Sequence, residues 1–138
     1  MLKSYKYRMY PTKKQEELFF KHFGASRFIY NWGLEQKIKT YEQDGKSILR
    51  FDLNKGITML KRNEEHEWLK DVNPQSLQGA TLNLDNAFTR FFREKKGFPK
   101  FKSRKNPVQS FSVPQNYVIN YVTIQPDKKL SITILTKS

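Results

Sequence analysis

Basic side chains alternate with aromatic ones in three stretches of the sequence. Lysine and arginine neutralise phosphates, and an aromatic face can stack on an unpaired base, so the pattern predicts nucleic-acid binding. The alternative is that the aromatic residues form a core and the lysines keep the surface wet. For residues 98–105 we favour binding, because so basic a loop gains little else from its charge. The basic residues of the three stretches are Lys3, Lys6 and Arg8; Arg93, Lys95 and Lys96; and Lys100, Lys102, Arg104 and Lys105. All of them except Arg93 are candidate contacts.

Uncharged polar side chains gather near the start of a strongly periodic segment that follows Asn73. They are Gln75, Ser76, Gln78 and Asn83. Glutamine and asparagine can pair with adenine through two hydrogen bonds, and serine can contact any base. Such a helix face could read a groove, although polar helix faces are also common in proteins that bind no nucleic acid. Gln75 and Gln78 are therefore candidate contacts.

The total charge favours the same class of partner. The 138 residues carry 26 Lys+Arg against 13 Asp+Glu, a net charge of +13. Self-repulsion at this charge opposes compaction, so a polyanion is the natural partner, nucleic acid first and an anionic membrane surface second. No apolar run approaches the ~20 residues that a membrane span requires. No apolar segment follows the basic N-terminus, so we expect no secretory signal, a cytoplasmic protein and no membrane partner.

Catalytic and metal-binding arrangements are missing from the sequence. There is no cysteine, and the two histidines, His22 and His66, share no ligand spacing. Glycine-rich phosphate loops and nucleophile motifs are absent, and the acidic residues are scattered where a two-metal nuclease needs them to converge. We therefore expect that this chain is not an enzyme and has no metal and no cofactor.

The elements that must position these residues follow a simple order. Alternation over residues 1–10 predicts a strand, and Thr12 with Gln15 predicts a capping box at a helix start. Gly24 is expected to break this helix, and a second helix is expected over 26–43. A third should begin at Asp52 and a fourth should run from Asn73 to Gly97.

The remaining sequence predicts β-structure. An extended basic loop after Gly97 is followed by strand-like runs at 109–113, 117–124 and 129–136. The expected fold class is α+β: an N-terminal strand, an inserted bundle of about four helices, and C-terminal strands that complete a small partial β-barrel with the first strand. The expected domains are a β portion (1–11 and 98–138) and a helical insertion (12–97).

Four stretches, in this order, resemble the N-terminal region of the TnpB (OrfB) family. They are YKYRMYPTKKQ (5–15), GASRFIYNWGL (24–34), LQGATLNLDNAFTRFF (77–92) and GFPKFKSR (97–104). Members of that family are transposon-encoded, RNA-guided DNA endonucleases. The resemblance implies a wedge-like β portion and a helical recognition portion, also described as helix-turn-helix. These two portions grip guide RNA and a short motif beside the target DNA.

The resemblance also implies particular contacts. The motif-reading positions correspond to Gln78 and Ser112, and to Arg50 and Asn54 in the loop before the third helix. The RuvC-like nuclease domain and zinc-finger cysteines of the family have no counterpart here. We therefore expect a nucleic-acid-binding fragment whose partners are duplex DNA and structured guide RNA. The alternative is a non-functional or interaction-only remnant that depends on a full-length partner.

Overall fold

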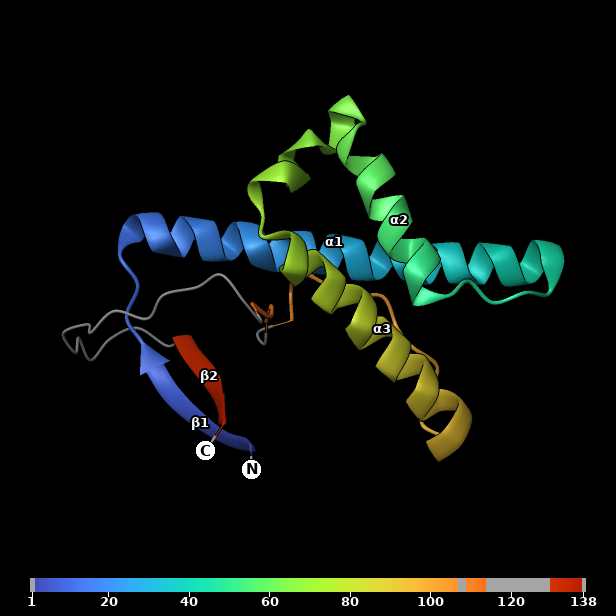
Figure 1. Ribbon diagram of the computed structural model, residues 1–138. Coiled ribbons are helices and arrows are strands. Elements are labelled where there is room, and N and C mark those ends of the chain that lie inside the picture. The colour runs from blue at the N-terminus through green and yellow to red at the C-terminus, as the bar shows by residue number, and fades with distance from the viewer. Residues whose placement is uncertain (1, 107–108, 114–129, 138) are drawn as a thin grey trace. The chain divides into compact units, whose positions relative to one another are not determined.

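The structure, a computed structural model, describes residues 2–106, 109–113 and 130–137, with the backbone alone for 2–9 and 130–137 (Figure 1). It divides into two compact units, Met1–Phe19 with Val118–Ser138 and Phe20–Tyr117. No helix in the described residues is long and apolar enough to cross a membrane. The elements in chain order are β1 (Leu2–Met9), α1 (Lys13–Asp44), α2 (Arg50–Lys61), η1 (Glu64–Asp71, a 3-10 helix), α3 (Pro74–Glu94) and β2 (Leu130–Lys137).

Helix α1 is one continuous helix of 32 residues. The capping box at its start is confirmed: the Thr12 N–H donates to Gln15 Oε1 (2.9 Å) and the Gln15 N–H to Thr12 Oγ1 (3.3 Å). The expected break at Gly24 is wrong. A glycine costs a helix only about 1 kcal/mol, and buried residues such as Ala25 and Ile29 continue the packed face past it.

Two local signals set the ends of α3. Asn73 is its N-cap and accepts a hydrogen bond from the Gln75 N–H (2.9 Å), so the predicted start is confirmed. The helix ends at Glu94 and is capped by Lys95, whose φ of 54° is left-handed, rather than by Gly97 as expected. The predicted cap of α2 is wrong, because the N-cap is Leu49 and Asp52 lies inside the first turn.

The core lies where α2 and α3 cross α1 (Figure 1). Gly33 of α1 permits this approach, since a Cβ there would lie 2.9 Å from Leu84 Cδ2 and 3.5 Å from Leu53 Cδ1. η1 adds Leu69, which is fully buried. The buried apolar residues are Ala25, Ile29, Tyr30, Leu34, Leu53, Ile57, Leu69, Val72, Leu77, Ala80 and Leu84. All of them belong to the unit that spans Phe20–Tyr117.

The expected α+β class with a partial β-barrel is wrong. The described part of the chain is predominantly helical, and its β-structure is a single antiparallel pair of β1 with β2, in register from Leu2 opposite Lys137 to Met9 opposite Leu130. The expected strand at 109–113 is also wrong: these residues form no strand, and the Ser112 carbonyl accepts a hydrogen bond from Ser76 of α3. The expected strand at 117–124 lies outside the described residues.

Candidate nucleic-acid interface

Residues 97–106, which we call the basic loop, are anchored at their start by aromatic packing. The Phe98 ring lies 5.5 Å from Phe88 and 5.2 Å from Phe91, both of α3, in edge-to-face geometry. Pro99 is buried beside it. These contacts remove most of the freedom that a loop of this composition would otherwise have.

Asn31 of α1 fixes the middle of the loop. Its Nδ2 donates to the Lys102 carbonyl (3.0 Å), and its Oδ1 accepts from the Lys102 N–H (2.7 Å). The Lys102 ammonium lies 4.7 Å from the centre of the Tyr30 ring, a cation–π contact. The Lys102 backbone is therefore held by two hydrogen bonds to a helix.

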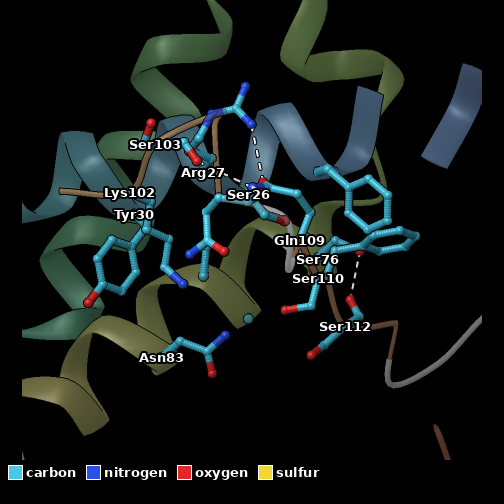
Figure 2. A pocket seen from close by; sticks show the side chains of 15 residues that line it. Ser26, Arg27, Tyr30, Ser76, Asn83, Lys102, Ser103, Gln109, Ser110 and Ser112 are labelled. Carbon is cyan, nitrogen blue, oxygen red and sulfur yellow. Dashed lines mark hydrogen bonds between the residues drawn. The ribbon is translucent and has the colours of Figure 1, made fainter. Parts of the chain in front are cut away.

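The Gln109 side chain forms hydrogen bonds with both α1 and the basic loop. Arg27 donates to Gln109 Oε1 (3.2 Å), and Gln109 Nε2 donates to the carbonyls of Asn106 (2.7 Å) and Ser103 (3.3 Å). Figure 2 shows Arg27 directed toward Gln109. One side chain thus contacts α1, Ser103 and Asn106 together.

Ser112 rests on the first turns of α3. The Ser76 hydroxyl donates to the Ser112 carbonyl (2.7 Å; Figure 2), and a Cβ on Gly79 would touch Ser112 Cβ at 3.4 Å. The neighbouring Phe111 ring packs 4.8 Å from His22 and 5.3 Å from Phe23. The small Gly79 allows residues 109–113 to lie directly on the helix.

These contacts surround a polar hollow between α1, α3 and residues 102–106 and 109–112 (Figure 2). Hydroxyl, amide and basic groups line it, a mixture suited to sugar, phosphate and base edges. Tyr30 is one of the lining residues; burial raises the pKa of its hydroxyl, an effect that the charge of Arg90 partly offsets. The polar lining residues are Ser26, Arg27, Tyr30, Ser76, Asn83, Lys102, Ser103, Asn106, Gln109, Ser110 and Ser112.

Comparison with known proteins places the chain in a family. Residues 1–46 match the helix-turn-helix domain of the OrfB family. The chain is 32% identical over 103 residues to a Streptomyces pristinaespiralis protein named as an RNA-guided DNA endonuclease, and 32% identical over 114 residues to Escherichia coli InsQ, which carries the same description. The chain belongs to the TnpB (OrfB) family.

The matches differ in how much of each TnpB-family relative they cover. They take in 75% and 83% of this chain but only 26% and 28% of the two endonucleases, so the chain spans about a quarter of their length. The chain is also 34% identical over 113 residues to the virulence protein VsdF of Salmonella dublin, covering 75% of this chain and 95% of VsdF.

Two of the predicted contact residues, Lys102 and Ser112, line the polar hollow of this TnpB-family chain. Gln78 lies on the same stretch of α3 and is exposed, whereas Gln75 is half-buried. The cations expected to meet phosphates are exposed on the end of α3 and on the basic loop: Lys95, Lys96, Lys100, Arg104 and Lys105.

The other predicted contacts lie on α2 and on β1. Arg50 and Asn54 belong to α2 rather than to the expected loop, and Asn54 Oδ1 accepts a hydrogen bond from Thr81 (2.7 Å). Neither residue lines the hollow. Lys3, Lys6 and Arg8 lie on β1, opposite Thr136, Thr133 and Ser131 of β2.

Arg27, Asn31 and Gln109 are residues of the site that the sequence did not predict. Arg27 and Asn31 are four residues apart on one face of α1, inside a stretch that carries the family resemblance. Their spacing is a usable signal, whereas Gln109 has none. Among the described residues, no group of three or more His, Cys, Asp or Glu side chains could hold a metal ion.

Proposed function

We propose that this chain is a nucleic-acid-binding part of a TnpB-type system, which holds the backbones of duplex DNA and structured guide RNA and does no cutting itself. In this proposal residues 12–97 supply recognition, and residues 1–11 with 98–138 supply the wedge-like part. The observation that carries the proposal is the fixed basic loop. Its backbone is bonded to α1 while Lys100, Arg104 and Lys105 remain exposed.

A fixed backbone under exposed cations favours binding for a physical reason. Ordering a flexible loop on association costs free energy, and a loop that is already ordered avoids most of that cost. The cations can then replace the counterions condensed on a phosphate backbone. The helical fold by itself does not indicate nucleic-acid binding, since one fold can serve many functions.

The test is a titration of the purified chain against labelled duplex DNA and a structured RNA at about 50 and about 200 mM salt. We expect tight binding that weakens steeply with salt. Joint replacement of Lys100, Lys102, Arg104 and Lys105 by alanine should weaken binding to every sequence. It should also flatten the slope of log K against log salt by about 0.9 for each phosphate that the loop no longer neutralises.

A matched variant controls for the loss of charge. Four exposed lysines lie elsewhere: Lys14 on α1, Lys46 in the segment after α1, Lys55 on α2 and Lys70 on η1. Their joint replacement by alanine removes the same charge. The proposal requires the loop variant to lose more affinity than this control. Equal losses would mean that only net charge matters, and weak binding unaffected by salt would contradict phosphate contacts altogether.

Gln78 tests whether the chain reads bases as well as phosphates. Its side chain is exposed in the second turn of α3. If it pairs with a base, Gln78→Ala should relax the preference for one flanking DNA motif by about 1–3 kcal/mol, with little change on other sequences. Gln43, exposed near the end of α1, supplies the control Gln43→Ala. Equal losses on all sequences would remove the reading role.

The alternative is an interaction-only chain that depends on a full-length relative. It predicts no binding of the isolated chain at low salt, and binding only when a full-length relative is added. The same titration therefore separates the two proposals.

A further inference from the structure

A second hollow in the same unit is lined mainly by rings. Phe28 and Trp32 come from α1, His66 and Trp68 from η1, and Phe101 from the basic loop. The Phe28 ring centre lies 5.5 Å from that of Trp68, edge to face, and 5.1 Å from that of His66. We call this site the aromatic hollow.

Backbone packing holds the Trp32 ring in place. A Cβ on Gly56 of α2 would lie 2.6 Å from Trp32 Cη2, so the indole rests directly on the α2 backbone. Trp32 is thus a rigid wall of the hollow. A rigid aromatic wall is a good stacking surface, because little side-chain freedom remains to be lost on binding.

The aromatic rings of this hollow are more exposed than the core residues beside them in the chain. Their sequence neighbours Ile29 and Leu69 are fully buried in the core, whereas Phe28 and Trp68 are only half-buried. Phe101 is 57% exposed, on a loop whose backbone is fixed one residue later at Lys102. An exposed ring on a fixed loop gives the free protein little stability, so its placement fits a ligand.

The charges near the aromatic hollow favour a ligand that carries negative charge. Lys100 and Lys102 flank Phe101 in the chain, and Arg27 borders both this hollow and the polar one. The acid in the lining, Glu35, is paired with Lys39 at 2.9 Å. Rings beside several cations suit a group that joins a flat aromatic body to a phosphate, which is a nucleotide.

We propose that the aromatic hollow holds one unpaired nucleobase, extruded from a strand whose phosphates lie on the basic loop. This inference rests on the proposed function, because the loop must hold the strand. A base inside a duplex is stacked on its neighbours and its faces are covered, so the ligand is a single-stranded segment of RNA or of DNA. Stacking accepts every base, so base preference is weak at this site.

Intrinsic fluorescence reports on the site directly. The chain has two tryptophans, and both Trp32 and Trp68 line the aromatic hollow. The chain would be titrated with single strands of about eight nucleotides, one RNA and one DNA, with an abasic strand of equal length, and with a duplex. Anisotropy of a label on each strand measures binding independently of the tryptophan signal.

The proposal expects tryptophan quenching by the strands that carry bases and none by the abasic strand or the duplex. Comparing the RNA and DNA arms shows which strand supplies the base. Equal quenching by the abasic strand, or binding of the base-carrying strands with no quenching, would overturn the base site while leaving phosphate binding intact. No anisotropy change with any ligand at low salt would instead overturn the proposed function.

A substitution at the rim supplies the second measurement. Phe101→Ala should lower affinity for the base-carrying strand about tenfold and leave the abasic strand unchanged. The control is Phe51→Ala, because Phe51 is 67% exposed on α2 and does not line the hollow. Both rings are exposed, so neither change should unfold the chain. Equal effects of the two substitutions would contradict the proposal.

Discussion

At the scale of single residues, Asn31 holds the backbone of the basic loop on α1. One amide side chain satisfies both backbone groups of Lys102, at 3.0 and 2.7 Å. Asn31→Ala should free the loop and lower the free energy of unfolding by about 1–2 kcal/mol, since each hydrogen bond contributes about 1 kcal/mol. Faster trypsin cleavage after Lys100 to Lys105 would show the release.

Two further variants make the Asn31 test specific. Asn31→Asp keeps the acceptor for the Lys102 N–H and loses the donor, so it should fall between the wild type and Asn31→Ala. Gln43→Ala removes an exposed amide elsewhere on α1 and should change neither cleavage nor stability. Unchanged loop cleavage in Asn31→Ala would mean that Phe98 and Gln109 fix the loop without it.

Lys37 is a largely buried lysine, and burial disfavours its charged form. Its side chain is 8% exposed, and its ammonium donates to the Ile48 carbonyl (2.7 Å), lies 3.9 Å from Asp85 and lies 5.1 Å from the Phe88 ring centre. Burial lowers its pKa below the ordinary 10.5, and Asp85 offsets only part of that effect. Deprotonation is therefore easier in the folded chain than in the unfolded one.

The sign of the pH effect follows. Between the folded pKa of Lys37 and 10.5, the unfolded chain binds more protons, so this group makes the free energy of unfolding rise with pH. Urea unfolding from neutral pH to just below 10 should show a smaller rise in Lys37→Met than in the wild type. Tyr30 has a pKa raised above 10.0 and acts with opposite sign only at higher pH. Parallel curves would contradict the prediction.

At the scale of elements, helix boundaries that depend on neighbouring residues were predictable from the sequence, and those that depend on tertiary packing were not. The α3 start and the capping box of α1 are decided by neighbours within three residues, so they were predictable. The break at Gly24 was not real, because the packing of α1 against distant helices outweighs one poor helix former. The contact between Arg27 and Gln109 could not be predicted for the same reason, because the two residues are 82 positions apart in the chain and only the tertiary fold brings them together.

Gly24 and Gly56 are a matched pair for testing this balance. A Cβ on Gly24 would meet nothing nearer than Arg27 Nη2 at 3.6 Å, so Gly24→Ala should raise the free energy of unfolding by about 1 kcal/mol. Gly56→Ala gains the same helix propensity, but its Cβ would lie 2.6 Å from the Trp32 ring. It should lower stability on balance and shift tryptophan emission, because a rigid ring must move. Stabilisation by both changes would contradict the packing.

At the scale of the whole molecule, the basic residues that favour nucleic-acid binding should also lower the stability of the free chain, because they repel one another. The net charge is +13, and the buried apolar residues that the structure describes all lie in the unit Phe20–Tyr117. Like charges repel, and the repulsion weakens as salt shortens the screening length. Binding by phosphate contacts has the opposite dependence, since added salt competes with counterion release.

The two dependences predict opposite trends in one experiment. From about 50 to about 300 mM salt, the Tm of the free chain should rise as repulsion is screened. The increase in Tm on adding saturating duplex DNA should shrink over the same range, because the ligand stabilises only in proportion to its affinity. Replacement of Lys100, Lys102, Arg104 and Lys105 by alanine should diminish the second trend while leaving the first in place.

Two outcomes would contradict this account. Trends of the same sign would mean that charge contributes to folding and binding through something other than repulsion and phosphate contact. A melt without cooperativity would favour the chain that depends on a full-length relative.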